Sequence, residues 1–193
     1  MKSTALFICL VALAACTAQG GTAKKKTDEK GGGMKALKVT SPAFADGGYI
    51  PEKYACGGKD VSPALRWEGA PPGVKSFAVI MEDPDAPAGT WVHWVLFDIP
   101  ASAGGLPEAL PKEDALRDGS RHGICWGVNE DDFSRMGYYG PCPPPGKPHH
   151  YHFMVYALDI VPGLPAGTPK GALLDAMKGH VLAQGELVGV YKR

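Results

Sequence analysis

The sequence predicts a mainly β domain with a few helices, preceded by an export signal and a linker. Three observations lead to this prediction. Glycine (26) and proline (18) are abundant and spread through the chain, as in proteins built from short strands and turns. Several apolar runs have the length of β-strands, and one segment near the C-terminus repeats its apolar residues at helical spacing.

Residues 1–15 are predicted to be a lipoprotein signal peptide. Lys2 precedes an apolar stretch, Ala5 to Leu13, that is too short to span a bilayer. Leu13-Ala14-Ala15-Cys16 resembles the lipobox of bacterial lipoproteins, in which the cysteine is lipidated and becomes the new N-terminus. The sequence therefore predicts export and lipid anchoring to the bacterial cell envelope membrane, facing the periplasm or the cell surface. The alternative is an ordinary signal peptide in which Cys16 is incidental.

Residues 16–33 are predicted to be the lipidated cysteine and a flexible linker, because they contain no aromatic and no large apolar side chain. The body, residues 34–193, has the length of one domain with a substantial core. Removing the first 33 residues, which hold five lysines and two acids, leaves 15 Lys and Arg against 18 Asp and Glu. This balance, with the basic residues scattered, argues against nucleic-acid binding.

Six segments of the body are predicted to be strands. The strongest are Ser76–Glu82, Trp91–Ile99, Tyr151–Asp159 and Glu186–Tyr191, and the weaker ones are Leu37–Thr40 and Leu65–Trp67. Their apolar residues follow one another almost without interruption, rather than alternating with polar ones. This pattern predicts central strands that are covered on both faces.

A helix is predicted near the C-terminus, with Thr168 as its N-cap and Pro169 at the first helical position. Leu173, Leu174, Met177 and Val181 recur at helical spacing and would form its buried face.

The cysteines of the body allow a disulfide, but the sequence leaves its pairing open. Cys56, Cys125 and Cys142 remain in the exported body, and they allow at most one internal disulfide without indicating which pair forms it. No Cys-x-x-Cys unit occurs, so a zinc ribbon or a thioredoxin-type site is not expected.

Two short segments concentrate the residues capable of chemistry. The first is Asp83-Pro84-Asp85-Ala86-Pro87 with Trp91-Val92-His93-Trp94, and the second runs from Gly140 to Phe153. Because side chains two apart on a strand share a face, Trp91 should point with His93, and His149 with Tyr151. If both faces meet above the aspartate turn, they enclose one pocket. Taken separately, however, the same parts fit an ordinary turn, a core histidine and a plain proline connection.

The proline-rich loop limits which backbone groups can bind a ligand. Pro143, Pro144 and Pro145 have no N–H, so Gly140, Gly146 and Lys147 supply the free donors. A rigid turn with a few exposed amides predicts an anion-binding concavity, with Gly140 and Gly146 in contact with the ligand.

Five motifs in this order resemble the phosphatidylethanolamine-binding protein family, which includes the Raf kinase inhibitor proteins and their bacterial homologues. They are Ser62-Pro63-Ala64-Leu65-Arg66-Trp67, Asp83-Pro84-Asp85-Ala86-Pro87, Trp91-Val92-His93-Trp94, Gly140-Pro141-Cys142-Pro143-Pro144 and His149-His150-Tyr151. The resemblance implies a large antiparallel sheet packed on a smaller sheet, with a few peripheral helices. It also implies a small pocket for phosphate-bearing headgroups, formed by Asp83, Asp85, Pro87, Trp91, His93, Pro143, Pro144, His149 and Tyr151.

Two further expectations follow from this resemblance. The family usually has arginine where this chain has His150, a position that strand alternation turns away from the pocket. A Cys56–Cys142 disulfide is favoured, because both cysteines lie in loops that flank family motifs, and Cys125 would then remain free.

The function predicted from the sequence is non-catalytic binding of a small phosphate-bearing or zwitterionic ligand by a membrane-tethered protein, with no cofactor, no metal and no nucleic acid. One alternative is a hydrolase, such as a metal-dependent phosphoesterase, that uses the Asp and His residues. Against it, the chain has no Gly-x-Ser-x-Gly elbow, no His-Glu-x-x-His and no P-loop. The other alternative is an inhibitor-like interaction module, although no partner-binding face is marked in the sequence.

Overall fold

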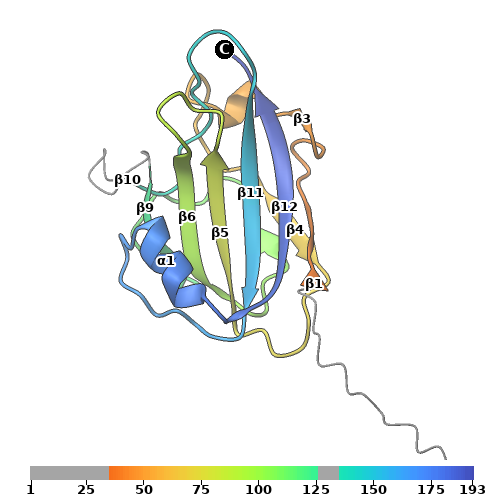
Figure 1. The fold of residues 1–193 in the computed structure, drawn as a ribbon, viewed down its shortest axis with the longest axis vertical. Coiled ribbons are helices and arrows are strands. Elements are labelled where there is room, and N and C mark those ends of the chain that lie inside the picture. The colour runs from red at the N-terminus through yellow and green to blue at the C-terminus, as the bar shows by residue number, and fades with distance from the viewer. Residues whose placement is uncertain (1–34, 126–134) are drawn as a thin grey trace, which may run out of the picture. The chain divides into compact units, whose positions relative to one another are not determined.

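The structure is a computed structural model that describes residues 35–125 and 135–193 (Figure 1). The predicted signal peptide, the lipidation site at Cys16 and the linker lie outside the described residues. The secondary structure elements are β1 (Lys35–Ala36), β2 (Lys38–Thr40), β3 (Gly48–Tyr49), the 3-10 helix η1 (Glu52–Tyr54), β4 (Leu65–Glu68), β5 (Ser76–Asp83), β6 (Trp91–Pro100), β7 (Gly105–Leu106), β8 (Arg121–His122), β9 (Ile124–Cys125), β10 (Arg135–Met136), β11 (His149–Leu158), α1 (Lys170–Met177) and β12 (Val181–Tyr191).

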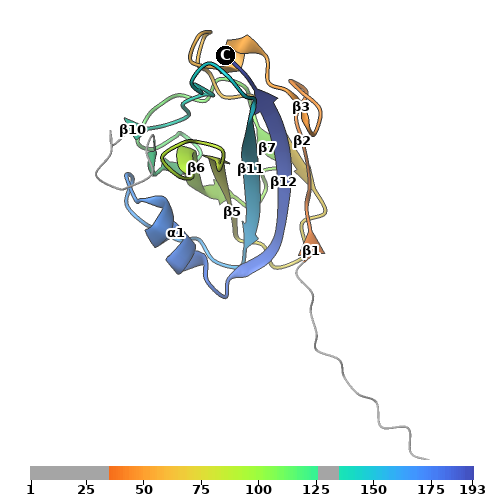
Figure 2. The same cartoon turned by 45° about the horizontal axis from the view of Figure 1, so that its top comes forward.

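The large sheet has seven strands, in the order β1-β12-β11-β5-β6-β8, with β3 also paired to β12. The four long strands, β12, β11, β5 and β6, are antiparallel to their neighbours, whereas β1 and β3 run parallel to β12 at the edge. A three-stranded sheet, β2-β4-β7, lies against one face of the large sheet, and α1 lies against the other (Figures 1 and 2). The predicted class, a mainly β fold with a large sheet packed on a smaller one, is confirmed.

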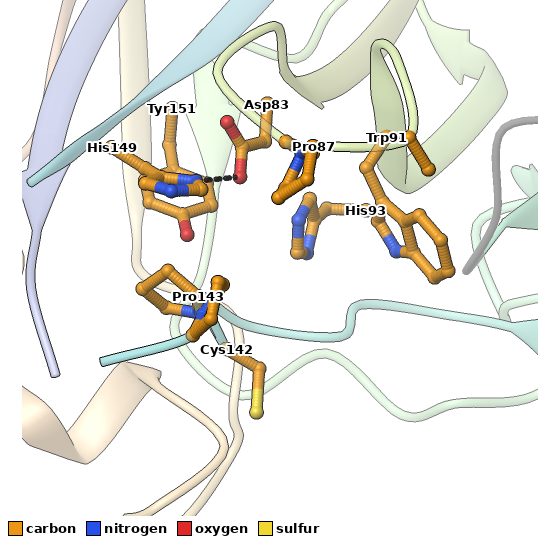
Figure 3. Close-up of a pocket in the computed structure, with 11 residues that line it drawn as sticks. Asp83, Pro87, Trp91, His93, Cys142, Pro143, His149 and Tyr151 are labelled. Carbon is orange, nitrogen blue, oxygen red and sulfur yellow. Dashed lines mark hydrogen bonds and ion pairs between the residues drawn. The ribbon is translucent and has the colours of Figure 1, made fainter. Parts of the chain in front are cut away.

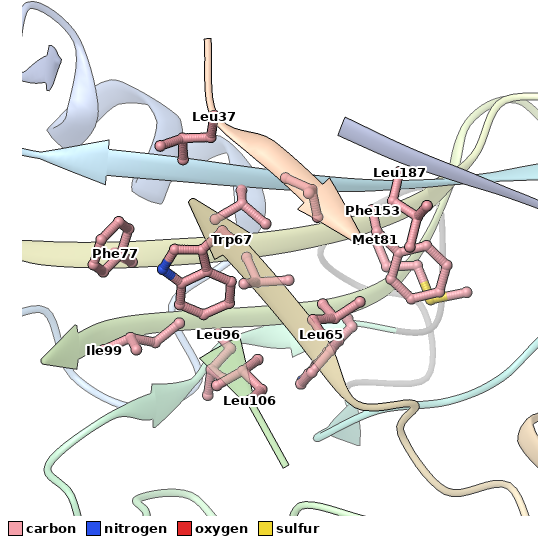
Figure 4. Close-up of a cluster of buried hydrophobic side chains, with 14 of the residues drawn as sticks. Leu37, Leu65, Trp67, Phe77, Met81, Leu96, Ile99, Leu106, Phe153 and Leu187 are labelled. Carbon is pink, nitrogen blue, oxygen red and sulfur yellow. The ribbon is translucent and has the colours of Figure 1, made fainter. Parts of the chain in front are cut away.

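Both faces of β5 and β6 are buried, as the uninterrupted apolar runs predict, whereas the prediction was wrong for β11 and β12, in which buried residues alternate with half-buried or exposed ones. Between the two sheets, Trp67 of β4 packs on Phe77 of β5 with ring centroids 5.2 Å apart, within a cluster that includes Leu65, Leu96 and Leu106 (Figure 4). A second cluster on the opposite face joins strand and helix residues, namely Ala78, Ile80, Val95, Phe97, Leu173 and Met177. Strands β5 and β6 are therefore held by apolar packing from both sides.

All six predicted strands are present, with shifted boundaries. Strand β11 begins at His149, two residues before the predicted start, and β12 begins at Val181, five residues before it. The earlier start of β11 matters for the site, because it fixes His149 on a regular strand in register with Tyr191.

The C-terminal helix begins later and ends earlier than its sequence pattern suggests. Pro169, with extended backbone (φ −70°, ψ 155°), is the N-cap, and the hydroxyl of Thr168 donates to the carbonyl oxygen of Pro165 instead of capping the helix. Gly179 at φ +80° follows the helix end, and Val181 belongs to β12. No helix among residues 35–125 and 135–193 is long and apolar enough to cross a membrane.

Candidate ligand-binding pocket

One pocket of about 230 Å³ opens at the end of the large sheet where β5 ends and β6 and β11 begin (Figure 3). It lies among the loop from β5 to β6, the starts of β6 and β11, and the proline-rich loop before β11. The lining residues are Asp83, Ala86, Pro87, Ala88, Trp91, His93, Cys142, Pro143, Pro144, His149 and Tyr151. Its volume lies below the range of pockets for drug-sized ligands, so it fits a small molecule or a headgroup.

Asp83 and His149 form a buried pair in this pocket. The Oδ2 atom of Asp83 lies 2.8 Å from Nδ1 of His149, and the side chains are 4% and 9% exposed. The other carboxylate oxygen, Oδ1, accepts the backbone N–H of Asp85 at 2.9 Å. The carboxylate is therefore held from both sides, and it fixes the orientation of the His149 ring.

His93 reaches the pocket through a β-bulge in β6. Met81 pairs with Trp94 and Glu82 pairs with Val92, so His93 is the extra residue between the two pairs. A bulge turns two successive side chains to the same side of the sheet. His93 and Trp94 therefore both point toward the smaller sheet, and the His93 ring meets Tyr151 edge-on with centroids 5.2 Å apart.

Burial lowers the pKa of His93 to about 4, although the carbonyl of Tyr139 and the carboxylate of Asp83 act in the opposite direction. The Nδ1 atom lies 2.7 Å from the carbonyl oxygen of Tyr139. A carbonyl oxygen only accepts, so Nδ1 carries the proton of the neutral ring. Neutral His93 therefore donates its single N–H to the backbone. Its other ring nitrogen, Nε2, carries no proton and cannot donate to a phosphate oxygen.

Tyr151 supplies a hydroxyl donor to the same pocket. Burial, and after it the negative charge of Asp83, raises the pKa of Tyr151 far above its usual value, so the phenol stays protonated. Within the described part of the chain, no hydrogen-bond partner satisfies this buried hydroxyl. An unsatisfied buried donor at a pocket wall is costly unless a ligand or water completes it.

The proline-rich wall is held by a disulfide and by a hydrogen bond to the carboxylate of Asp60, and its glycine amides are not free. Cys56 and Cys142 are disulfide-bonded, the pair favoured from the sequence, and Cys125 is a buried free thiol. The N–H of Gly140 donates to Oδ1 of Asp60 at 2.7 Å, and that of Gly146 points to the carbonyl of Arg193 at 3.4 Å.

Three predicted site residues therefore stand outside the pocket lining. The amides of Gly140 and Gly146 are engaged within the protein, which corrects the expectation that they contact the ligand. Asp85 turns away from the pocket and accepts from the backbone N–H of His150 at 2.8 Å, with Nδ1 of His150 2.7 Å from the same oxygen. These contacts lower the pKa of Asp85 and give it a structural role that the sequence pattern did not reveal.

The remaining eight predicted residues all line the cavity: Asp83, Pro87, Trp91, His93, Pro143, Pro144, His149 and Tyr151. Sequence reasoning missed Ala86 and Ala88, which carry no polar side chain, and Cys142, which was considered only as a disulfide partner. It also missed Asp60, whose contact with Gly140 comes from a distant loop.

No group of three or more His, Cys, Asp or Glu side chains among residues 35–125 and 135–193 is arranged to hold a metal ion. His150, which is exposed, and His152, which is half-buried, share the outer face of β11, and each faces a carboxylate. His150 lies against Asp85, and Nδ1 of His152 is 2.6 Å from Oε1 of Glu186.

We expect the burial of His93 to make stability depend on pH. Its pKa is about 4 in the folded protein and near the ordinary value of 6.5 in the unfolded chain. As the pH falls through 6.5, His93 takes up a proton in the unfolded state. In the folded protein it does not take up this proton until about pH 4. The free energy of unfolding should therefore fall by roughly 3 kcal/mol across this window.

The measurement is urea unfolding at several pH values between 7 and 4, on the unmodified protein and on His93→Asn. Asparagine keeps a donor for the Tyr139 carbonyl but does not titrate, so the other acid-sensitive groups cancel in the comparison. The two proteins should show different pH slopes. Equal slopes would mean that the pKa of His93 is the same in the folded and unfolded states, which would contradict the effect of burial.

The family model described as phosphatidylethanolamine-binding protein matches residues 40–192. A UPF0098 protein of Methanothermobacter thermautotrophicus is 45% identical over 157 residues, covering 81% of this chain and 99% of that protein. A UPF0098 protein of Pyrococcus horikoshii is 48% identical over 166 residues, covering 84% of this chain and 81% of that protein.

Two solved structures share the architecture. A phosphatidylethanolamine-binding protein homologue from Chlamydia trachomatis superposes with a TM-score of 0.71 at 35% identity, covering 82% of this chain and 99% of that chain. Escherichia coli YbcL, described as a new member of the mammalian family, gives 0.70 at 36% identity, covering 81% and 98%. The fold and the pocket motifs define a protein of the phosphatidylethanolamine-binding class. This chain belongs to the phosphatidylethanolamine-binding protein family.

Proposed function

We propose that the protein is a non-catalytic binding protein for small phosphate-bearing or zwitterionic molecules, such as phosphoethanolamine. One observation supports this most strongly. Three separate segments bring a carboxylate, two imidazoles and a phenol, from Asp83, His93, His149 and Tyr151, to one cavity of about 230 Å³. A pocket of that size with few but convergent polar groups is typical of small-ligand sites.

The polar groups suit the two ends of a zwitterion. Tyr151 offers its hydroxyl to a phosphate oxygen, and His149, when protonated, offers Nε2–H, because Nδ1 faces Asp83. The Asp83 carboxylate, with further lone pairs on both oxygens, can accept from an ammonium group. The indole of Trp91 adds an aromatic face for the same cation.

The rigidity of the pocket walls supports binding without large rearrangement. Pro87, Pro143 and Pro144 restrict the loops, the disulfide holds Cys142, and hydrogen bonds from two sides hold Asp83. A preformed pocket avoids the cost of ordering its groups when the ligand arrives.

The test is calorimetric titration with phosphoethanolamine and inorganic phosphate. We expect His149→Ala to abolish binding and Tyr151→Phe to weaken it by about tenfold or more, the usual worth of a hydrogen bond to a charged group. Tyr151→Phe also removes an unsatisfied buried hydroxyl, so the variant should be at least as stable as the unmodified protein. Lower affinity with unchanged or higher stability separates a binding role from a folding role.

Tyr49→Phe is the matched control, since Tyr49 is 67% exposed and lies outside the pocket lining. It should bind as the unmodified protein does. Absence of heat with either ligand, or equal affinities for the Tyr151 and Tyr49 variants, would refute the proposal.

A hydrolase remains the second candidate, because a carboxylate on Nδ1 of a histidine is an arrangement used by general bases. The described pocket lining contains no serine, threonine or free thiol to act as a nucleophile, and Cys142 is disulfide-bonded. A phosphomonoesterase assay with and without chelator distinguishes the two candidates. Turnover that His149→Ala eliminates would favour the enzyme.

We further propose that the domain is exported and tethered to the cell envelope through lipidated Cys16, on the basis of the Leu13-Ala14-Ala15-Cys16 motif. Several acyl chains together anchor a protein stably, whereas one chain binds reversibly. In a bacterial host the full chain should fractionate with membranes, and Cys16→Ser should release it. Membrane association that survives Cys16→Ser would contradict lipid anchoring at this residue.

A further inference from the structure

The pocket interior lacks a fixed positive charge. Its described lining contains no lysine and no arginine, while Asp83 brings a carboxylate. Burial lowers the pKa of His93 to about 4, so this ring is neutral at pH 7. A phosphate monoester carries between one and two negative charges at that pH. Beside His149 and the ligand's own ammonium group, a side chain with a permanent positive charge near the pocket would help to balance a bound phosphate.

Arg193 lies beside the proline-rich loop that forms one wall of the pocket. Strand β12 ends at Tyr191, whose register partner is His149 at the start of β11. Two residues further on, the backbone of Arg193 runs beside the proline-rich loop, where its carbonyl oxygen accepts from Gly146 at 3.4 Å. Figures 1 and 2 show the C-terminus next to the loop that leads into β11.

The guanidinium of Arg193 contacts the proline-rich loop on the side away from the cavity, because the Cys142 sulfur points out of the pocket in Figure 3. Its Nη1 atom is 3.4 Å from Sγ of Cys142, a residue that lines the pocket and is held by the disulfide. Sulfur is a weak acceptor. In residues 35–125 and 135–193, no Asp or Glu lies within ion-pair distance of Arg193. The guanidinium can therefore turn toward a ligand without losing a salt bridge.

We propose that Arg193 is the phosphate-positioning residue of this pocket. Figure 3 shows the Tyr151 hydroxyl directed toward Pro143 and the Asp83 carboxylate beside His149. A phosphate on the Pro143 side is then shared between Tyr151 and the paired N–H groups of Arg193, while the ammonium end faces Asp83. A guanidinium binds phosphate oxygens in pairs, which fixes orientation as well as charge.

This inference rests on the proposed function and selects phosphate-bearing ligands over amines that carry no phosphate. The test is titration of phosphoethanolamine into the unmodified protein, Arg193→Gln, Arg193→Lys and the control Arg66→Gln. Arg66 is an exposed arginine on β4, so its loss changes the net charge equally without touching the pocket. We expect about a tenfold loss of affinity for Arg193→Gln, and less for Arg193→Lys, which keeps the charge but not the paired donors. Arg66→Gln should stay within about twofold of the unmodified protein.

A second arm uses vesicles of phosphatidylethanolamine. Dependence on Arg193 in both arms identifies the headgroup phosphate of a lipid as a ligand, and dependence in the soluble arm alone identifies a free phosphate compound. If the unmodified protein binds and Arg193→Gln binds equally well, the inference is overturned while the proposed function stands. Equal losses in Arg193→Gln and Arg66→Gln also overturn it, because they indicate a non-specific charge effect. If the unmodified protein binds nothing in either arm, both proposals fail.

Discussion

Removal of the Cys56–Cys142 disulfide is expected to lower the free energy of unfolding by roughly 4–5 kcal/mol, because the bond closes a loop whose ends are 86 residues apart. Such a cross-link acts mainly by restricting the unfolded chain. It also joins the loop after η1 to the proline-rich wall, where the N–H of Cys56 donates to the carbonyl of Pro141 at 3.1 Å. Because Cys142 lines the pocket, affinity for phosphoethanolamine should fall along with stability.

The measurement is urea unfolding of the unmodified protein and of the double variant Cys56→Ser/Cys142→Ser. Adding reductant to the double variant is the control, and it should change nothing further, because Cys125 is already a free thiol. An unfolding free energy within 1 kcal/mol of the unmodified protein would show that other contacts hold this loop.

Gly140→Ala is expected to destabilise the protein by about 3 kcal/mol, the upper part of the usual range for overpacking. A Cβ at this position would collide with the carbonyl group of Tyr54 and lie 3.0 Å from the Cα atom of Ala55. These are backbone atoms that cannot rotate away. The collision would push the 140–144 segment outward and widen the pocket. It would also break the hydrogen bond from the N–H of Gly140 to Oδ1 of Asp60.

Gly104→Ala is the matched control, since a Cβ there meets nothing within 4 Å and the backbone has no positive φ. Thermal and urea unfolding of both variants provide the comparison. If Gly140→Ala were as stable as Gly104→Ala, the close crossing of these two loops would be disproved.

Strands β5 and β6 could be predicted from the sequence because their apolar runs reflect burial on both faces. Ser76–Asp83 and Trp91–Pro100 are buried almost throughout, and no other common element gives that pattern at that length. The short strands β3, β7, β8, β9 and β10 have two residues each and carry no periodicity. They are determined by long-range pairing, which a local pattern cannot reveal.

The candidate site illustrates the same limit. Strand alternation correctly places Trp91 with His93 and His149 with Tyr151, and all four line one cavity. However, the bulge at His93 is what turns that part of β6 toward Asp83. Its position depends on how Met81 and Glu82 of the neighbouring strand pair, and therefore could not be obtained from the spacing of residues in β6.

The prediction for the glycine amides failed for a similar reason. Counting the prolines of the 140–146 segment identifies which N–H groups exist, but not what they bind. The partner of Gly140, Asp60, is 80 residues away in the sequence. The partner of Gly146 is the carbonyl oxygen of Arg193, which follows the end of β12. Long-range acceptors of this kind take up donors that local reasoning leaves available to a ligand.

The most direct test of the whole account is a crystal structure of the protein soaked with phosphoethanolamine at saturating concentration. The account predicts one ligand between the rings of His93 and His149, with a phosphate oxygen within hydrogen-bond distance of the Tyr151 hydroxyl and the ammonium group next to Asp83. An empty pocket, or a ligand found only outside it, would contradict the assignment of this cavity as a phosphate-ligand site.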